Sequence, residues 1–503
     1  MVLNNQVFLL FLISLIGFSC TSHVEKTEDM AYEAGTYKEK YRPQFHFSPP
    51  ANWMNDPNGM VYHKGEYHLF YQYYPDSNVW GPMHWGHAVS KNLVEWENLP
   101  IAIAPDSLGW IFSGSAVFDS ENSSGLGTQE DPPLVAIFTY HNHLKDEAGS
   151  SDVQTQGIAF SLDNGRSWKK YKGNPVLTNP GIRDFRDPKV RKMVVEGKEK
   201  WIMSLAVKDK ISFYSSPNLL DWRHESDFNP DWATYDGVWE CPDLFPLKTQ
   251  DGEEKWVLLV SISPGGPNGG SATQYFVGDF DGQTFTTNQK EVKWLDYGTD
   301  NYAGVTWSNI PSSDGRTLFI GWMSNWRYAK VVPTDVWRSA MTLPRTLSLL
   351  GEGDELWIGS KPVEELEQLR DHSATLEGGN IALEHELLEI ALQPKASDFS
   401  ATFKNGSGEM LVIGKKEGEL FIDRTKSGLT DFKEEFASII KAPLKDLEVK
   451  DIDIFLDRAS IEVFVNDGAL VMTALVFPTA AYTELQLKGF ETKSKLYSLK
   501  GIW

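Results

Sequence analysis

The stretch WIMSL at residues 201–205 decides the fold, because apolar runs of the same kind occur four more times between about residues 41 and 345. The other four runs lie at 67–71, 134–138, 256–260 and 318–322. Each has the length and apolar content of a buried strand. Successive runs are roughly 55 to 70 residues apart, which is close to the length of a four-stranded propeller blade with long loops.

A second element repeats between these runs and consists of a strand, a turn and then an aromatic residue. It occurs at 88–96, 159–168 and 213–222, each ending in Trp, and in a degenerate form at 277–285. Asn, Asp and Gly supply the turns, and helical periodicity is almost absent. Because blades repeat whereas sandwich strands need not, the pattern predicts an all-β chain with a five-bladed β-propeller over residues 41–345.

The texture of the sequence changes after the LGEG stretch at 350–353, where Trp becomes rare and short alternating strands begin. Residues 452–457 and 461–465 flank a short turn and predict a hairpin. A brief helix is expected at 363–369. We therefore expect a linker over 346–358 and a β-sandwich domain over 359–503.

The first residues indicate export. An apolar run at 7–18 is too short to span a bilayer with any margin, and Ser19-Cys20 follows it. We expect a signal peptide at 1–19, lipidation of Cys20, a polar tether over 20–40, and anchoring at the bacterial outer membrane on the cell surface. Simple secretion and an uncleaved anchor are the alternatives. Cys241 is the only other cysteine, so no disulfide framework is expected.

The charge and motif content exclude several classes of ligand. A net charge of -22 repels phosphate backbones and anionic lipids, so we expect no nucleic acid and membrane contact only through the lipid anchor. The histidines match no zinc spacing and no phosphate-binding loop is present, so we expect neither a metal nor another cofactor. A neutral ligand fits this composition best.

Three acidic residues stand in turn-like settings near prolines: Asp56 in WMNDPNG at 53–59, Asp187 in RDP at 186–188, and Glu240 in WECPD at 239–243. A lone Asp-Pro usually means only a turn. Three such acids in successive parts of a propeller would point into one central funnel. A retaining glycosidase needs two carboxyl groups about 5 Å apart, and this arrangement could supply them.

These three motifs, in this order and spacing, resemble glycoside hydrolase family 32, which contains invertases, inulinases and levanases. Further matching stretches are FYQY at 70–73, WGH at 85–87, FSGS at 112–115, GWMSNW at 321–326 and DRASIEVF at 457–464. The resemblance covers about residues 44–503 and includes the C-terminal sandwich. It implies a propeller that carries the active site.

The resemblance also implies roles. Asp56 would be the nucleophile that forms a fructosyl-enzyme intermediate, and Glu240 would protonate the leaving group and then activate water. Asp187, with Arg186 beside it, would hold fructose hydroxyls and stabilise the transition state without reacting. The positions that would line the fructose pocket are Asn55, Gln72, Trp80, Phe112, Ser113 and Trp322.

Residues 321–345 favour a polymer over sucrose as the substrate, because this stretch resembles the sequences of microbial levanases and inulinases more than those of plant or yeast invertases. A surface anchor suits an enzyme that cuts polymers too large for import. The whole chain also resembles surface endo-levanases of gut bacteria, so we expect internal cleavage of the β-2,6 bonds of levan with release of fructo-oligosaccharides. We expect the protein to be a monomer. An exo-acting fructan β-fructosidase on inulin, levan or sucrose, a fructosyltransferase, and a non-catalytic surface glycan-binding protein are the alternatives.

Overall fold

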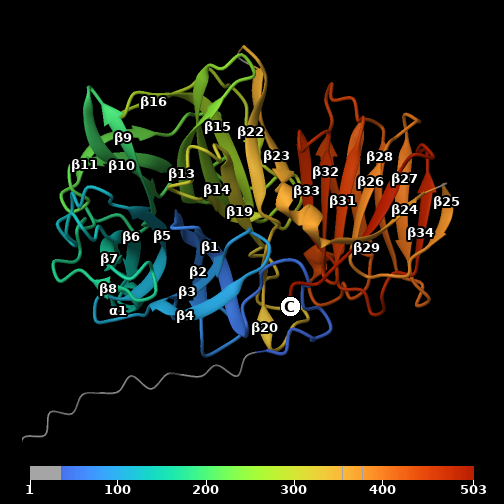
Figure 1. The fold of residues 1–503 in the computed structure, drawn as a ribbon, viewed down its shortest axis with the longest axis horizontal. Helices are drawn as coiled ribbons and strands as arrows, with labels where there is room; N and C mark the ends of the chain where they lie inside the picture. Colours follow the sequence, from blue (N-terminus) through green and yellow to red (C-terminus); the bar gives the residue numbers. More distant parts are fainter. Residues whose placement is uncertain (1–34, 354, 377) are drawn as a thin grey trace, which may run out of the picture.

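The protein is described by a computed structural model over residues 35–353, 355–376 and 378–503. A propeller and a sandwich lie side by side in it, with the sandwich formed by the C-terminal part of the chain (Figure 1). The predicted all-β fold, a five-bladed β-propeller followed by a β-sandwich, is confirmed. Over the described residues there is one short α-helix, α1 (His143–Glu147), and none long and apolar enough to cross a bilayer.

Five antiparallel sheets form the blades. The first contains β1 (Asn52–His63), β2 (Glu66–Tyr74), β3 (His84–Ser90) and β4 (Glu97–Ile103), and the second β5 (Trp110–Phe118), β6 (Leu134–His141), β7 (Gln154–Ser161) and β8 (Lys169–Lys170). The third contains β9 (Phe185–Val195), β10 (Lys198–Val207), β11 (Lys210–Ser216) and β12 (Arg223–Phe228). The fourth contains β13 (Val238–Lys248), β14 (Glu254–Ser263), β15 (Ala272–Phe280), β16 (Phe285–Thr286) and β17 (Lys293–Trp294). The fifth contains β18 (Tyr302–Thr306), β19 (Thr317–Met323), β21 (Ala340–Met341), β22 (Arg345–Glu352) and β23 (Glu355–Pro362).

The first strands of the five sheets, β1, β5, β9, β13 and β18, contact one another in a closed ring. The ring is fastened where β20 (Trp337–Arg338), which follows the fifth blade's inner strands, pairs in parallel with β1 of the first blade. The five apolar runs form strands, as the repeat predicts, and each is the second strand of its blade: β2, β6, β10, β14 and β19. They are apolar because neighbouring sheets bury both of their faces; every residue of β6, for example, is buried.

The end of the propeller differs from our expectation. Residues 346–358, expected as a linker, fall instead in the hairpin of β22 and β23. β22 pairs with β19, and β23 pairs with β22 and completes the fifth blade as far as Pro362. The glycines at 351 and 353 mark the turn of this hairpin, not a domain boundary. Leu347, Leu349 and Ile358 belong to the same apolar cluster as Leu259 of the fourth blade, which explains why the segment folds as strand.

The sandwich follows the 3-10 helix η1 (Glu364–Leu369), where the brief helix was predicted. One sheet contains β24 (Arg370–Thr375), β26 (Leu388–Leu392), β31 (Ile452–Asp457), β32 (Ser460–Val465), β33 (Leu470–Leu475) and β35 (Lys495–Leu499). The other contains β25 (Gly379–Ala382), β27 (Phe399–Lys404), β28 (Met410–Lys416), β29 (Glu419–Lys426), β30 (Ile439–Pro443) and β34 (Glu484–Lys488), with the 3-10 helix η2 (Glu434–Phe436) between β29 and β30. The predicted hairpin is the β31–β32 pair.

The predictions for the N-terminal segment concern residues that lie largely outside the described part of the chain. The expected signal peptide, Cys20 and most of the expected tether lie outside the described residues. The last part of the tether, residues 35–40, is not a free spacer. The Tyr37 ring stacks on Trp503 with centroids 4.2 Å apart, and Glu39 pairs with Arg42 at 3.0 Å, so the ordered body begins before residue 41.

Candidate active site

A cavity of about 370 Å³ lies where the inner strands of the propeller begin. Its walls come from residues of several blades. The lining residues are Asn55, Asp56, Gln72, Trp80, Phe112, Ser113, His141, Asp146, Val153, Gln154, Arg183, Asp184, Arg186, Asp187, Glu240, Trp326 and Lys330. Asp56, Asp187 and Glu240, the three acids of the sequence motifs, lie far apart in the sequence and therefore meet in one cavity through the fold.

Three of the inner strands share a local irregularity that directs these side chains into the cavity. The strand register shifts between Met54 and Pro57 in β1, between Ile111 and Gly114 in β5, and between Glu240 and Asp243 in β13. A register shift of this kind, a β-bulge, bends a strand and redirects a side chain out of the regular alternation. Asp56, Ser113 and Glu240 lie at these shifts, so the departures from regular pairing place the polar groups in the cavity.

Asp56 is held by hydrogen-bond donors on both carboxylate oxygens. Asn55 Nδ2 donates to Oδ1 at 3.0 Å, and Ser113 Oγ donates to Oδ2 at 2.8 Å. Burial and the nearby charge of Glu240 raise the pKa of Asp56, and the two donors act in the opposite direction. They favour the ionised form that a nucleophile requires and fix its orientation.

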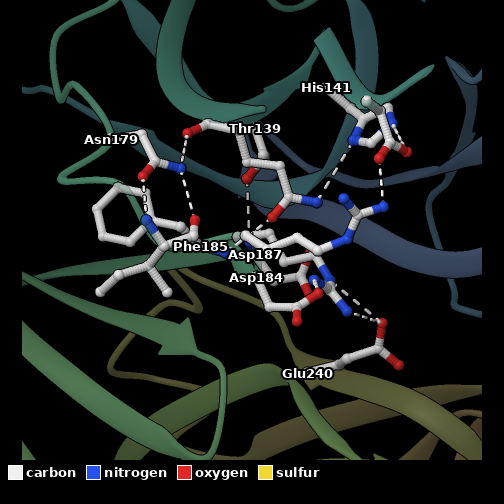
Figure 2. A network of polar contacts seen from close by, with 12 residues as sticks. Thr139, His141, Asn179, Asp184, Phe185, Asp187 and Glu240 are labelled. Carbon is white, nitrogen blue, oxygen red and sulfur yellow. Dashed lines mark hydrogen bonds and ion pairs between the residues drawn. The ribbon is translucent and has the colours of Figure 1, made fainter. Parts of the chain in front are cut away.

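Asp187 is buried and has a left-handed backbone, with φ of 64°. Its N–H donates to Thr139 Oγ1 at 3.0 Å (Figure 2). Thr139 Oγ1 donates to Gln156 Oε1 at 2.7 Å. Gln156 Nε2 in turn donates to the carbonyl of Phe185 at 2.8 Å. This chain of bonds satisfies an N–H that the unusual backbone would otherwise leave buried without a partner.

The charge environment of Asp187 is mixed. Burial raises the pKa of Asp187 to about 7; Arg186 acts against this, while Glu240 and Asp56 add to it. Cys241 lies between the two aspartates, because its Sγ is 3.5 Å from Asp56 Oδ2 and 3.6 Å from Asp187 Oδ2. Burial also raises the pKa of the Cys241 thiol, so it remains protonated beside the carboxylates.

Glu240 is bound by a cation on one carboxylate oxygen and by a phenol on the other. Arg186 donates to Oε1 from Nη2 at 2.9 Å and from Nε at 3.2 Å, and the hydroxyl of Tyr302 donates to Oε2. Burial opposes the charged guanidinium, but Glu240, Asp187 and Asp184 together hold the pKa of Arg186 above its usual range. The side chain of Glu240 is thus fixed at the cavity wall.

The pocket positions expected from the resemblance are placed as follows. Asn55, Gln72, Trp80, Phe112, Ser113 and Arg186 all line the cavity. Trp322 does not: it is 0% exposed and packs behind the wall against Trp53 and Trp326. Trp326 lines the cavity instead, because the turn that begins at Asn325 brings its ring forward over Trp53, with centroids 5.9 Å apart.

A group of residues on one side of the cavity was not predicted from the sequence. Arg183 pairs with Asp146, and Asp146 Oδ2 lies 3.4 Å from His141 Nε2. The His141 ring stacks on Phe112 with centroids 4.5 Å apart, and burial lowers the pKa of His141 to about 4, so it is neutral. His141 is the last residue of β6, Asp146 lies in α1, and Arg183 lies in the loop before β9. No motif in the sequence marks them.

Among the residues that the structure describes, no group of three or more His, Cys, Asp or Glu side chains is arranged so that it could hold a metal ion. Two carboxyl groups facing one cavity, one beside hydroxyl and amide donors and the other beside a guanidinium and a phenol, can supply a nucleophile and a proton donor.

Comparisons with known proteins agree with this geometry. The chain matches the family model described as "Glycosyl hydrolases family 32 N-terminal domain" over residues 46–359 and that described as "Glycosyl hydrolases family 32 C terminal" over residues 365–501. It is 46% identical to a levanase of Bacillus subtilis, over 94% of this chain and 72% of that protein. It is 38% identical to an extracellular exo-inulinase of Aspergillus awamori, over 93% of this chain and 96% of that protein.

Solved structures give the same result. The crystal structure of exo-inulinase from Aspergillus awamori has a TM-score of 0.83 at 35% identity, and the match covers 93% of this chain and all of that one. The structure of fructofuranosidase from Schwanniomyces occidentalis complexed with fructose has a TM-score of 0.80 at 32% identity, over 93% and 99% of the two chains.

Proposed function

The chain belongs to glycosyl hydrolase family 32 and is a fructan glycosidase; from this premise we propose that it cleaves the β-2,6 bonds of levan internally, by a retaining mechanism, and releases fructo-oligosaccharides. The observation that carries the mechanism is the meeting of Asp56 and Glu240 in one cavity, each with a different set of partners. Retention requires two carboxyl groups that reach one sugar unit, and one cavity lined by both meets this requirement.

In the proposed first step an oxygen of Asp56 forms a bond to the anomeric carbon of a fructosyl unit. The bond from that carbon to the leaving oxygen breaks, and the carboxyl proton of Glu240 moves to the leaving oxygen. In the second step Glu240 takes a proton from water, the water oxygen bonds to the anomeric carbon, and the Asp56 carboxylate is released. At this point the Asp56 carboxylate is charged again, and the hydrogen bonds from Asn55 and Ser113 stabilise that charge.

Asp187 and Arg186 act on the sugar and on Glu240 without forming a bond. Asp187 accepts a hydrogen bond from the Cys241 N–H at 3.0 Å and faces the cavity, where it can accept from fructose hydroxyls. Its charge would stabilise the positive charge that develops on the ring in the transition state. Arg186 orients the carboxyl group of Glu240.

Two observations support levan and internal cleavage. A relative that is 46% identical is named a levanase. The cavity also extends beyond the three acids to Trp80, Arg183, Trp326 and Lys330, so its wall offers aromatic and charged groups to further sugar units. Aromatic faces are suited to sugar rings because they cover the apolar side of the ring without requiring many hydrogen bonds.

Export and anchoring complete the proposal. Relatives named extracellular exo-inulinases support export, and Ser19-Cys20 after an apolar run supports lipidation of Cys20. An anchored enzyme would cut polymer at the cell surface. We propose that it acts as a monomer.

The second candidate is exo-acting release of fructose from inulin, levan or sucrose. It is favoured by the relatives named exo-inulinases, which are 38% to 39% identical to this chain over 93% of its length. These two functions share the site and the chemistry. They differ in how the polymer enters the cavity.

One experiment separates the candidates. The full chain is incubated with levan, inulin and sucrose, and the products are separated at the earliest measurable times. A ladder of levan oligosaccharides, with slower action on inulin and sucrose, is the expected result. Fructose as the only early product would replace the proposal by the exo-acting candidate, and no release of sugar from any of the three would remove both. The matched control is the Asp56→Asn variant, which should release nothing.

A further inference from the structure

A buried arginine of the sandwich contacts the propeller directly behind the active site. Arg424 in β29 is 0% exposed. Its Nη1 donates to Asp300 Oδ2 at 2.9 Å, and its Nη2 donates to the hydroxyl of Tyr328 at 3.1 Å. Asp300 and Tyr328 belong to the propeller, on either side of the inner strands β18 and β19.

The contact between Arg424 and Asp300 is connected to Glu240 through Tyr302. Asp300 lies two residues before Tyr302, the first residue of β18, and the Tyr302 hydroxyl donates to Glu240 Oε2. Asp300 is fixed on both oxygens: Tyr328 donates to Oδ1 at 2.7 Å, and Arg424 and the Leu475 N–H each donate to Oδ2 at 2.9 Å. The position at which β18 begins is therefore set by groups of the sandwich.

The contact between Arg424 and Tyr328 is connected to the cavity wall. Tyr328 lies in the turn 325–330, which carries Trp326 and Lys330 at the cavity. Asn325 Nδ2 at the start of this turn donates to the carbonyl of Thr299 at 2.7 Å, so the turn and the segment before β18 are tied to each other. Arg424 contacts both at once.

The surroundings of Arg424 make its position unusually well determined. The guanidinium lies over the Phe436 ring at 3.9 Å from the centroid, and its Nε donates to the Phe436 carbonyl at 2.8 Å. Nη1 also donates to the Leu475 carbonyl at 3.2 Å. Within the described residues, Asp300 has Arg424 as its only ion-pair partner. A buried ion pair contributes little net stability compared with apolar packing, and a fixed geometry is what it can add.

We propose that Arg424 is a positioning residue of the active site: through Asp300 and Tyr302 it sets the hydrogen bond to Glu240, and through Tyr328 it sets the turn that carries Trp326. The sandwich thus supplies a part of the active-site architecture in addition to covering the propeller. This inference rests on the proposed role of Glu240 as acid and base, because it acts through that carboxyl group.

The test compares two substrates. Levan needs protonation of its leaving oxygen, whereas nitrophenyl β-fructofuranoside has a leaving group that departs without it. The substrate ratio, which is kcat/KM on levan divided by kcat/KM on the nitrophenyl substrate, reports proton donation. This is because kcat/KM covers the first bond-breaking step only. In Arg424→Met this ratio should fall roughly tenfold, a part of the 10² to 10⁴ that a general acid supplies. Arg424→Lys, which keeps a charge near Asp300, should restore a part of it.

Tyr302→Phe removes the hydroxyl that contacts Glu240 and should lower the same ratio with the fold intact. If Arg424 acts through Tyr302, the variants are not additive, so Arg424→Lys or Arg424→Met added to Tyr302→Phe lowers the ratio little further. The cycle with Arg424→Lys gives the answer even where Arg424→Met does not fold. Full additivity, or an equal loss on both substrates in the Arg424 variants, would overturn the inference.

The matched control is His46→Gln, which removes another buried polar contact between the propeller and the sandwich. His46 binds Asp457 at 2.8 Å and Glu462 at 3.0 Å; among the described residues these bonds do not involve Asp300, Tyr302 or Tyr328. It should lower the unfolding midpoint and leave the substrate ratio unchanged. A change of the ratio in His46→Gln would make the Arg424 effect a general consequence of loosening the interface, which also overturns the inference. If Glu240→Gln itself leaves the ratio unchanged, the proposed role of Glu240 fails, and this outcome is distinct from a failure of Arg424 alone.

Discussion

Arg186 Nη2 lies 2.9 Å from Glu240 Oε1, and the next residue along the chain, Asp187, faces the same cavity. Two consecutive residues of a regular strand would point to opposite faces. The left-handed backbone of Asp187, with φ of 64°, and the register shift of the β9–β10 pair beside it break that alternation. The Arg186-Asp187 pair therefore places a cation on one carboxyl group and an anion beside the sugar.

Glu240→Gln keeps the shape of the side chain and its contact with Tyr302 but cannot donate or accept the catalytic proton. We expect hydrolysis of levan to fall by roughly 10² to 10⁴ with binding of levan retained. Initial rates and a binding isotherm measure the two effects. Turnover close to that of the unaltered enzyme would remove Glu240 from the mechanism.

Thr139→Val removes the hydroxyl that accepts from the Asp187 N–H (Figure 2) and that donates to Gln156. The N–H is then buried without a partner, which costs about 1–3 kcal/mol, and the left-handed backbone of Asp187 loses its support. We expect lower stability together with a lower kcat on levan. Thr139→Ser keeps the hydroxyl and is the matched control; equal kcat values in Val and Ser variants would contradict this role.

The sequence was sufficient to predict the blades and the acids, for physical reasons. The second strands are buried on both faces and thus carry an uninterrupted apolar run, and the acids stand in short proline-containing motifs, two of which coincide with register shifts of β1 and β13. The division between Trp322 and Trp326 could not be predicted, since both lie in one aromatic stretch and only the turn at Asn325 decides which ring reaches the cavity. The contact of Arg424 with Asp300 joins residues 124 apart, and no local pattern marks it.

Trp326→Ala removes an aromatic face from the cavity wall, whereas Trp322→Phe alters the packing behind it. We expect the first change to raise KM for levan severalfold with a small effect on the unfolding midpoint. The second should lower the midpoint and change KM little, because Trp322 is fully buried. Kinetics on levan and thermal unfolding of both variants check this. The reverse pattern would mean that Trp322 is the residue that contacts the sugar.

Stability should depend on pH through His46. Burial by itself lowers the pKa of His46, but its bonds to Asp457 and Glu462 outweigh this and raise the pKa to about 9, from 6.5 in the unfolded chain. The folded state therefore holds the proton more tightly, and the added stability is complete below pH 6.5 and lost as pH rises through 9. The loss is on the order of 3 kcal/mol.

Denaturant unfolding at pH 6 and pH 9.5 measures this loss. His46→Gln is the control, because it has no group that titrates at this position and should show a smaller decrease over the same range. An identical decrease in both proteins would assign the pH dependence to other groups.

The central claim is that Asp56 and Glu240 act on one furanose ring, and trapping the intermediate tests it most directly. In Glu240→Gln an activated nitrophenyl β-fructofuranoside can still fructosylate the nucleophile, but no base remains to activate water, so the covalent intermediate should accumulate. Peptide mass spectrometry after acid quenching should then find one fructosyl unit on Asp56. A fructosyl unit on any other residue, or none on the protein while nitrophenol is released, would contradict the account.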